Sequence, residues 1–389
     1  MLPLQRCKTI WRSITRYTVS LGLAFAAAVA AVAPSNATFI SVAAAHFLAW
    51  DANHDGVLSA QELDTLMADP GVTNDVAAAV AALKRASRSR TFKLPPLTLE
   101  NITALANSPR EAGKPDLAKM YREGLSRIDN TGRRTLFGSG LPQLKTIHQG
   151  KLGNCFCLAP LGAMLQRSPE DVARMFSMQP NGTCQLSLGT NTVTVQLPTD
   201  AELAMTSSNE HDGIWINLYE KGLGQLRNEA RPPEQRAGLA IDALARGGSA
   251  GTMLAYITGH EITRFSFKFS KDASTSKEQR ETKLKELRCQ LAEAATAKRL
   301  MTCGTLKTTT PGLTPNHAYA VLDYDASSDS VTLWNPHGGK FSPKGPANVK
   351  NGYPQQDGIL KVPVPDFVQQ FSGMAFEASK GGNDAKSSS

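Results

Sequence analysis

The sequence lacks a strong excess of charge of either sign. Its formal net charge is +8 over 389 residues. Arg6, Lys8, Arg12 and Arg16 supply four of these charges within residues 1–37, a stretch without acidic residues. The rest of the chain therefore carries about +4, the difference between +8 and those four charges, which is too little to predict nucleic acid as a partner. A long internal repeat is also absent, so nothing indicates a repeat architecture.

Beyond residue 37 the sequence lacks an apolar run of the about 20 residues that cross a bilayer. Before that point, the basic start is followed by apolar residues from Val19 to Val32 and then by Ser35-Asn36-Ala37. This order is the layout of a secretory signal peptide with its cleavage site. We therefore expect residues 1–37 to be removed and the protein to be secreted or in the cell envelope, without stable membrane insertion. The alternative is an uncleaved membrane anchor.

Cysteine is scarce, and its number in the exported chain is odd. Cys7 leaves with the signal peptide. An odd count in an exported protein leaves at least one free thiol. Two disulfides and one reactive cysteine would fit, although the sequence does not assign the pairs. The five remaining cysteines are Cys155, Cys157, Cys184, Cys289 and Cys303.

Hydrophobic residues make up 41% of the chain, which is enough for a sizeable buried core. Helical patterns come first and paired strands later, an order that favours an α+β fold. Helices are expected over residues 39–50, 60–67, 76–84, 99–106, 114–128, 155–178, 215–226 and 277–298. Strands are expected over residues 317–324, 330–334 and 358–362.

Composition also divides the chain. Segment 85–96 is charged and carries two consecutive prolines, which is typical of a linker. The C-terminal residues are rich in Gly, Ser and Asn, so we expect them to be disordered. The expected regions are a small helical region at 38–84, a linker with helices at 85–134, a larger domain at 135–378 and a tail at 379–389.

The segment DANHDGVLSAQE, residues 51–62, fits the twelve-residue EF-hand calcium loop at every defining position. Gly56 stands at the sixth position, where the loop bends sharply, and apolar Leu58 at the eighth can pack against a partner loop. No second loop of this kind is found. We expect Ca²⁺ to bind here; the alternative is an Asx-rich turn that binds nothing. The expected oxygen ligands are Asp51, Asn53, Asp55, Val57, Ser59 and Glu62.

Extracellular calcium modules bind the ion with Kd of about 10⁻⁴–10⁻³ M, so a weak site outside the cell stays filled. A site that is always filled makes a poor switch, and we expect the loop to stabilise the N-terminal region. The alternative is that calcium moves segment 85–96 off a functional cleft.

The segment QGKLGNCFCLA, residues 149–159, combines a glycine-rich loop with the start of an apolar helix. Cys155 stands at the junction. A helix N-terminus favours anions, so we expect it to lower the pKa of this thiol and make it reactive. A buried structural cysteine or half of a disulfide is the alternative.

A hairpin is expected farther along the chain, with strands on both sides of a turn at residues 325–329. If the turn is centred on Ala326 or Ser327, His317 and Asn335 project from the same face. The asparagine amide oxygen can then accept a hydrogen bond from the imidazole and aim its other nitrogen at a thiol. Alone, His317 would be a structural histidine and Asn335 a turn residue.

These three segments together resemble the calpain family of cysteine peptidases. Residues 149–159 are similar to its cysteine motif, HAY at 317–319 to its histidine motif and NPHG at 335–338 to its asparagine motif. Weaker likenesses are the IWINLYEK segment at 214–221 and the glycine-rich segment at 247–259. The resemblance covers about residues 136–376. It implies a papain-like two-lobed fold, here preceded by a small helical EF-hand region.

The resemblance also implies endopeptidase chemistry on a protein or peptide substrate. Cys155 would attack the peptide carbonyl, His317 would exchange the proton, and Asn335 would orient the histidine. Gln149 would donate its side-chain amide to the oxyanion beside the backbone N–H of Cys155.

The sequence departs from the family pattern at three positions. Asn154 replaces an aspartate, Phe156 a tryptophan, and His337 the tryptophan that shields the His–Asn bond from water; Trp334 is a candidate substitute for that shield. Three other functions compete with the peptidase. They are an inactive calpain-like calcium-binding interaction protein, a calcium sensor with the large domain as docking surface, and a transglutaminase-like enzyme. The asparagine and the glutamine favour hydrolysis.

Overall fold

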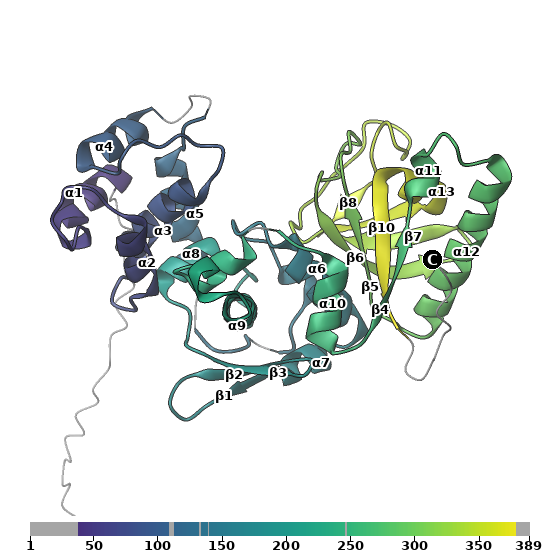
Figure 1. Ribbon diagram of the computed structural model, residues 1–389, viewed down its shortest axis with the longest axis horizontal. Coiled ribbons are helices and arrows are strands. Elements are labelled where there is room, and N and C mark those ends of the chain that lie inside the picture. Colours follow the sequence, from purple (N-terminus) through teal and green to yellow (C-terminus); the bar gives the residue numbers. More distant parts are fainter. Residues whose placement is uncertain (1–37, 109–112, 132–133, 139, 246, 379–389) are drawn as a thin grey trace, which may run out of the picture. The chain divides into compact units, whose positions relative to one another are not determined.

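The computed structural model describes residues 38–108, 113–131, 134–138, 140–245 and 247–378 (Figure 1). The predicted signal peptide at 1–37 and the predicted disordered tail at 379–389 lie outside these residues. Helices and strands are mixed in the described part, which confirms the α+β expectation. None of its helices combines the length and apolar character that a membrane span requires.

Four helices form the N-terminal region, and their starts follow from local sequence. Thr38 and Ser41 form a reciprocal cap on the first helix, and Ser59 and Glu62 form the same cap on the second. Such capping boxes satisfy backbone N–H groups that a helix start leaves unpaired. The helices are α1 (Phe39–Trp50), α2 (Ala60–Ala68), α3 (Asn74–Arg88) and α4 (Leu99–Asn107).

The alanine-rich helix α3 packs closely against α5 (Leu117–Thr131) and α8 (Asp200–Met205). A Cβ added to Gly124 on α5 would lie 3.2 Å from the Cβ of Ala204 on α8 and 3.6 Å from the Cα of Ala78 on α3. Small residues therefore permit this contact. One hydrophobic core runs from α1 to the helices of the larger domain, so the N-terminal region shares its core with that domain.

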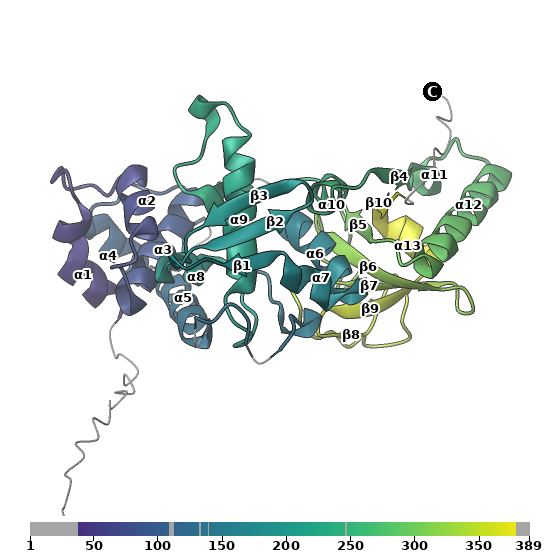
Figure 2. The ribbon, with the colours of Figure 1, turned by 90° about the horizontal axis from the view of Figure 1, so that it is seen from below.

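More helices and a small antiparallel sheet precede the C-terminal strands (Figure 2). The helix expected over 155–178 is broken in two, because Ser168 is extended and caps a new helix that begins with Pro169. The helices are α6 (Cys155–Arg167), α7 (Pro169–Arg174), α9 (Trp215–Glu229) and α10 (Ala250–Thr258), and short 3₁₀ turns span Leu144–Thr146, Pro233–Gln235 and Ala240–Leu244. The strands are β1 (Phe176–Met178), β2 (Cys184–Leu188) and β3 (Asn191–Val195), none of which the sequence led us to expect.

The C-terminal part is a seven-stranded antiparallel sheet of order β4-β10-β5-β6-β7-β9-β8. Its second hydrophobic core includes residues of two helices, α12 and α13, while α6 and α10 contact its strands from the first core. The strands are β4 (Ile262–Ser266), β5 (Met301–Thr305), β6 (Ala318–Asp325), β7 (Ser330–Trp334), β8 (Gln355–Gln356), β9 (Ile359–Pro363) and β10 (Phe371–Glu377). The helices are α11 (Lys268–Lys271), α12 (Lys277–Thr296) and α13 (Val364–Gln370).

The five cysteines of the described residues are all free. Cys157, Cys184 and Cys303 are buried on α6, β2 and β5. The two disulfides that the odd count allowed are therefore not formed, and the buried thiols are part of the apolar core.

Candidate active site

Cys155 is the first residue of α6, and its thiol is free and partly exposed. Gly153, at φ +73°, takes the left-handed conformation that favours glycine and turns the chain into the helix. The Sγ of Cys155 accepts a hydrogen bond of 3.4 Å from the backbone N–H of Ala318, the first residue of β6. The thiol therefore reaches the strand that directly follows His317.

The loop before Cys155 is held against its neighbours through its backbone. A Cβ added to Gly150 would lie 2.4 Å from the carbonyl of Thr206, so only glycine fits there. The N–H of Gln149 donates to the carbonyl of Pro336 at 2.8 Å. Gln149 is 8% exposed, and its buried Oε1 has no hydrogen-bond partner among the described residues. The predicted oxyanion residue is thus fixed to the loop that carries Asn335.

A buried carboxylate supports this loop. Glu220 on α9 is fully buried and accepts hydrogen bonds from the side-chain amide of Asn154 at 2.6 Å and from the Ser207 hydroxyl at 2.6 Å. The Ser207 N–H donates to the other carboxylate oxygen at 2.7 Å. Asn154 replaces the family's aspartate, and its amide donates here as an ionised aspartate cannot. The sequence signal was the IWINLYEK likeness, which contains Glu220 without revealing its partners.

A bulge in the β6–β7 hairpin decides which face Asn335 occupies. The pairing shifts by one residue at an irregularity between Val321 and Asp323. A shift of one residue moves the following side chains to the other face of a sheet. Continued past the strand ends, the shifted register places His317 and Asn335 diagonally on one face, which is the arrangement that the sequence predicts.

Nε2 of His317 and Oδ1 of Asn335 lie 2.8 Å apart, and both residues are buried. The N–H of His337 donates to the same Oδ1 at 3.0 Å. The His337 ring stacks on the His317 ring, with centroids 4.2 Å apart and planes at 23°. Trp334 packs elsewhere, because its ring lies against Gly162 of α6, where a Cβ would be 2.5 Å away. His337, and not Trp334, therefore covers the His–Asn pair.

Burial has the largest effect on the pKa values of both His317 and Cys155. The pKa of His317 is lowered from 6.5 to about 3, mainly by burial and then by the stacked His337, while the Asn335 hydrogen bond acts in the opposite direction. We expected the helix N-terminus to lower the pKa of Cys155. That expectation is wrong for the resting site, because burial raises the pKa of this thiol more than the N–H groups of Ala318 and Phe156 lower it.

The lowered pKa of His317 predicts a pH-dependent stability. Between pH 6.5 and about 3 the unfolded chain binds a proton at this histidine that the folded chain does not bind, so stability falls as pH falls through this window. Between pH 7 and pH 5 we expect the free energy of unfolding to drop by roughly 2 kcal/mol through this group. Urea unfolding of the wild type and of His317→Asn at both pH values measures the difference.

The His317→Asn variant has no titrating group at this position, so its pH profile should be flatter by that amount. If the wild type and the variant instead lose the same free energy of unfolding between pH 7 and pH 5, the folded protein binds the proton at His317 as readily as the unfolded chain does, so its pKa is not lowered. That outcome would overturn the prediction.

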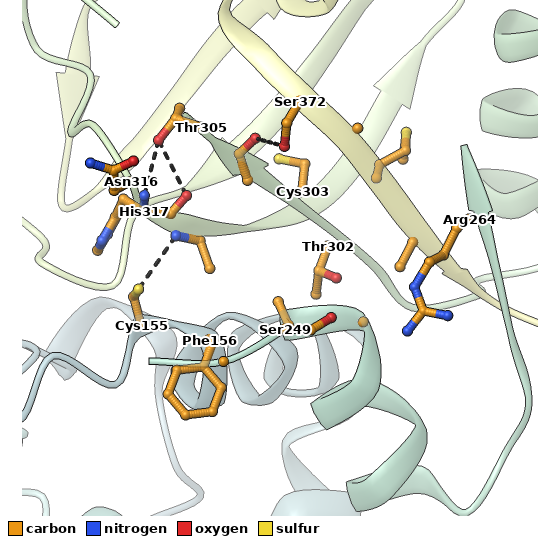
Figure 3. Close-up of a pocket in the computed structure, with 18 of the residues that line it drawn as sticks. Cys155, Phe156, Ser249, Arg264, Thr302, Cys303, Thr305, Asn316, His317 and Ser372 are labelled. Carbon is orange, nitrogen blue, oxygen red and sulfur yellow. Dashed lines mark hydrogen bonds between the residues drawn. The ribbon is translucent and has the colours of Figure 1, made fainter. Parts of the chain in front are cut away.

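Cys155 and His317 line a cleft of about 470 Å³ (Figure 3). Its other walls come from strands β4, β5 and β10 and from the residues around the start of α10, including Gly247 and Gly248. These glycines belong to the segment that resembles the family's glycine-rich stretch. None of the lining residues belongs to segment 85–96, so the described segment does not cover the cleft.

The predicted calcium loop joins α1 to α2 and is closed by its own side chains. Asp51 is 2% exposed, and its carboxylate accepts hydrogen bonds from the N–H groups of Gly56 at 2.8 Å and Asp55 at 3.2 Å. Gly56 has φ +81°, as the sixth loop position requires. Glu62 accepts from the N–H groups of Ala52 at 2.9 Å and of Ser59. The Ser59 bond is the largest cause that lowers the pKa of this carboxyl.

These oxygens suit a hard cation such as Ca²⁺. Asp51 and Glu62, from opposite ends of the loop, both bond its backbone, which curls the loop on itself. Within the part of the chain that the structure describes, however, no group of three or more His, Cys, Asp or Glu side chains is arranged to hold a metal ion. The loop has the oxygen-bearing residues and the glycine bend that an EF-hand requires, and its Asp51 and Glu62 carboxylates accept hydrogen bonds from backbone N–H groups.

A second helix–loop–helix faces this loop, which the sequence did not reveal. The N–H of Leu58 donates to the carbonyl of Leu97 at 3.1 Å. Each leucine directly precedes the residue that caps the next helix, Ser59 for α2 and Thr98 for α4. Residues 85–88 therefore belong to the end of α3, and Leu97, just past segment 85–96, contacts the predicted calcium loop. The partner loop carries no acidic residue from Ser89 to Thr98, so it lacks carboxylate ligands.

Helix α3 also reaches the loop before Cys155. The Arg88 guanidinium donates to the carbonyl of Lys151 at 2.6 Å and to the Asp242 carboxylate at 3.1 Å. Lys84 bridges that aspartate and Asp64 of α2. The N-terminal region is thus connected to the loop before Cys155 through charged side chains.

Comparison with known proteins assigns the family. No curated protein matches this chain. The family model described as calpain family cysteine protease matches residues 127–351, which is more than half of the chain. This protein therefore belongs to the calpain family of cysteine proteases.

Proposed function

We propose that this chain is an exported cysteine endopeptidase in which Cys155 is the nucleophile, His317 the general base and acid, and Asn335 the residue that orients the histidine. The observation that carries the proposal is the hydrogen bond from Ala318 to the Cys155 thiol, directly beside a histidine whose Nε2 is occupied by Asn335. With Nε2 bonded to an amide oxygen, Nδ1 is the nitrogen available to the thiol.

The reaction follows from these positions. Neutral His317 accepts the thiol proton as the Cys155 sulfur attacks the peptide carbonyl carbon, and the carbonyl oxygen becomes an oxyanion. Gln149 and the N–H of Cys155 donate to that oxygen. His317 then protonates the leaving amine, the C–N bond breaks and a thioester remains. Water, deprotonated by His317, releases the acid and restores the thiol.

Labelling with a peptidyl acyloxymethyl ketone tests the proposal. This electrophile alkylates a thiol that a neighbouring base activates, so the adduct should form on Cys155 and not on the exposed but isolated Cys289. Mass spectrometry of the digested protein locates the adduct. A folded protein that takes up no label would support an inactive calpain-like interaction protein instead.

We infer that the loop at residues 51–62 binds one Ca²⁺ that stabilises the N-terminal region. The ligands would be oxygens of Asp51, Asn53, Asp55, Val57, Ser59 and Glu62, and the ion would offset two of the three carboxylate charges. The shared hydrophobic core and the open cleft favour stabilisation over uncovering of the cleft.

The pair of substitutions Asp51→Ala and Glu62→Ala should remove the bound calcium ion, since they delete the first ligand and the bidentate ligand. Isothermal titration with CaCl₂ should give one site with Kd of about 10⁻⁴–10⁻³ M in the wild type and none in the variant. The matched control is Arg90→Ala with Asn101→Ala in the partner segment, which should keep the site. A double variant that still binds one ion would refute the assignment, as would a wild type that binds none.

Export is proposed from the sequence of residues 1–37. Thr38, which caps α1, directly follows the predicted cleavage site. The mature protein recovered from outside the cytoplasm should therefore begin at Thr38, and N-terminal sequencing tests this.

A further inference from the structure

Apart from the proposed catalytic pair, one side chain gives the cleft a full charge. Among the described residues that line it, the titratable ones are Cys155, His317, Cys303 and Arg264, and no Asp, Glu or Lys is present. Cys303 is buried, and burial raises the pKa of its thiol well above the ordinary value, so it stays neutral. Arginine keeps its charge throughout the pH range of proteins. Arg264 therefore sets the sign of the charge in the cleft.

The position of Arg264 follows from the sheet. It lies on β4 opposite Ala375 of β10 and is exposed. In Figure 3 it lies on the side of the pocket away from Cys155. Gly251 lets the start of α10 approach this edge, because a Cβ there would lie 2.7 Å from the Cβ of Ala375 and 3.7 Å from Nε of Arg264. The arginine stem therefore runs along the cleft wall.

The guanidinium is held in place but not neutralised. Nη2 donates to the Thr252 hydroxyl at 3.0 Å. No carboxylate of the described residues pairs with Arg264, in contrast to Arg167, Arg174 and Arg288, which all have acidic partners. A guanidinium has five N–H donors, so the bond to Thr252 leaves four, enough for a bidentate bond to a carboxylate.

The rest of the described cleft lining carries no charge that would compete with Arg264 for an acidic side chain of a bound substrate. The lining near Arg264 consists of small or apolar residues, among them Ser249, Thr302 and Met374. Among the described side chains that line the cleft, a carboxylate that enters with a bound peptide meets one cation and no anion, and a charge-assisted hydrogen bond is stronger than a neutral one.

Resting on the proposed peptidase function, we propose that Arg264 is a specificity-determining residue that selects substrates with Glu or Asp at one position near the scissile bond. Arg264 binds the substrate carboxylate through its free N–H groups and takes no part in bond cleavage. The substrate class is therefore acidic peptides and proteins with exposed acidic segments.

A positional-scanning peptide library tests the proposal, with Glu, Gln, Lys and Leu placed in turn at each position on both sides of the cleavage site. At one position the wild type should prefer Glu over Gln by about 10- to 100-fold in kcat/KM, the range expected for one charge-assisted bond. Arg264→Gln should abolish this preference, because kcat/KM for the Glu peptide falls to the level of the Gln peptide. Arg264→Glu should favour Lys at the same position.

Two control variants separate charge from structure. Thr252→Val removes the hydrogen bond to Nη2 but keeps the charge, so the preference for Glu should persist. Lys285→Gln removes one positive charge from the exposed face of α12, away from the cleft lining, and should change nothing. Raising the salt concentration should weaken the preference of the wild type, because an exposed charge is screened.

The two proposals fail in distinguishable ways. If the wild type cleaves the library but treats Glu and Gln alike at every position, or if Arg264→Gln keeps the preference, the role of Arg264 is refuted and the peptidase stands. If the folded wild type cleaves no peptide, the proposed function itself fails.

Discussion

Cys155→Ala should abolish peptide hydrolysis, with kcat lower by about 10⁴-fold or more, because the thiol that we propose to form the acyl-enzyme is lost. The protein should stay folded, since the thiol is small and partly exposed. Steady-state cleavage of a fluorogenic peptide, with circular dichroism as a check of folding, measures the effect.

Cys157→Ala is the matched control. This cysteine lies two residues farther along the same helix, about 200° around its axis, and its side chain is fully buried. Its thiol therefore faces the core and not the cleft, so the variant should keep most of its kcat. Loss of activity in a folded Cys157→Ala protein would show that the nucleophile has been misassigned.

Gln149→Ala should lower kcat by about 10²–10³-fold and change KM much less, because one preorganised donor to the oxyanion is lost. The backbone bond from Gln149 to Pro336 does not involve the side chain and survives the substitution. Measurement of kcat and KM with one good peptide substrate separates the two parameters.

Gln149→Glu distinguishes donation from packing. Glutamate has the shape of glutamine but accepts hydrogen bonds and carries a charge that repels an oxyanion. It should therefore reduce kcat at least as much as alanine does. If Gln149→Glu is nearly as active as the wild type, the residue fills space and the oxyanion is stabilised elsewhere.

The sequence alone predicts which residues are catalytic candidates better than it predicts the surroundings of those residues. Motif spacing points to Cys155, His317 and Asn335, because each residue type is needed by the chemistry itself. The bulge between Val321 and Asp323 is not visible in the sequence, since any residue can occupy it. The raised pKa of the thiol was missed for a related reason: a helix start is local, whereas burial depends on residues far along the chain.

In the N-terminal region, too, features set by neighbouring residues can be predicted from the sequence, whereas contacts between distant residues cannot. The predicted calcium loop can be found from the sequence because its proposed ligands are close together along the chain. Its partner cannot, because that loop keeps the helix cap at Thr98 and the apolar Leu97 but no acidic residue. The linker interpretation of residues 85–96 came from their charge and prolines, and Arg85 and Arg88 instead belong to α3. Their partners Glu123 and Lys151 are distant in sequence.

The continuous hydrophobic core limits how far this protein can be shortened without loss of its fold. A fragment limited to residues 127–351 would begin inside α5 and lack both α3 and Gly124, so the side of α8 that packs against them, including Ala204, would face water. It would also lack β10, whose removal would leave the facing edges of β4 and β5 unpaired in mid-sheet. Such exposed edges invite pairing with other chains. The smallest soluble form should therefore extend from Thr38 to the end of β10, and a shorter piece should precipitate.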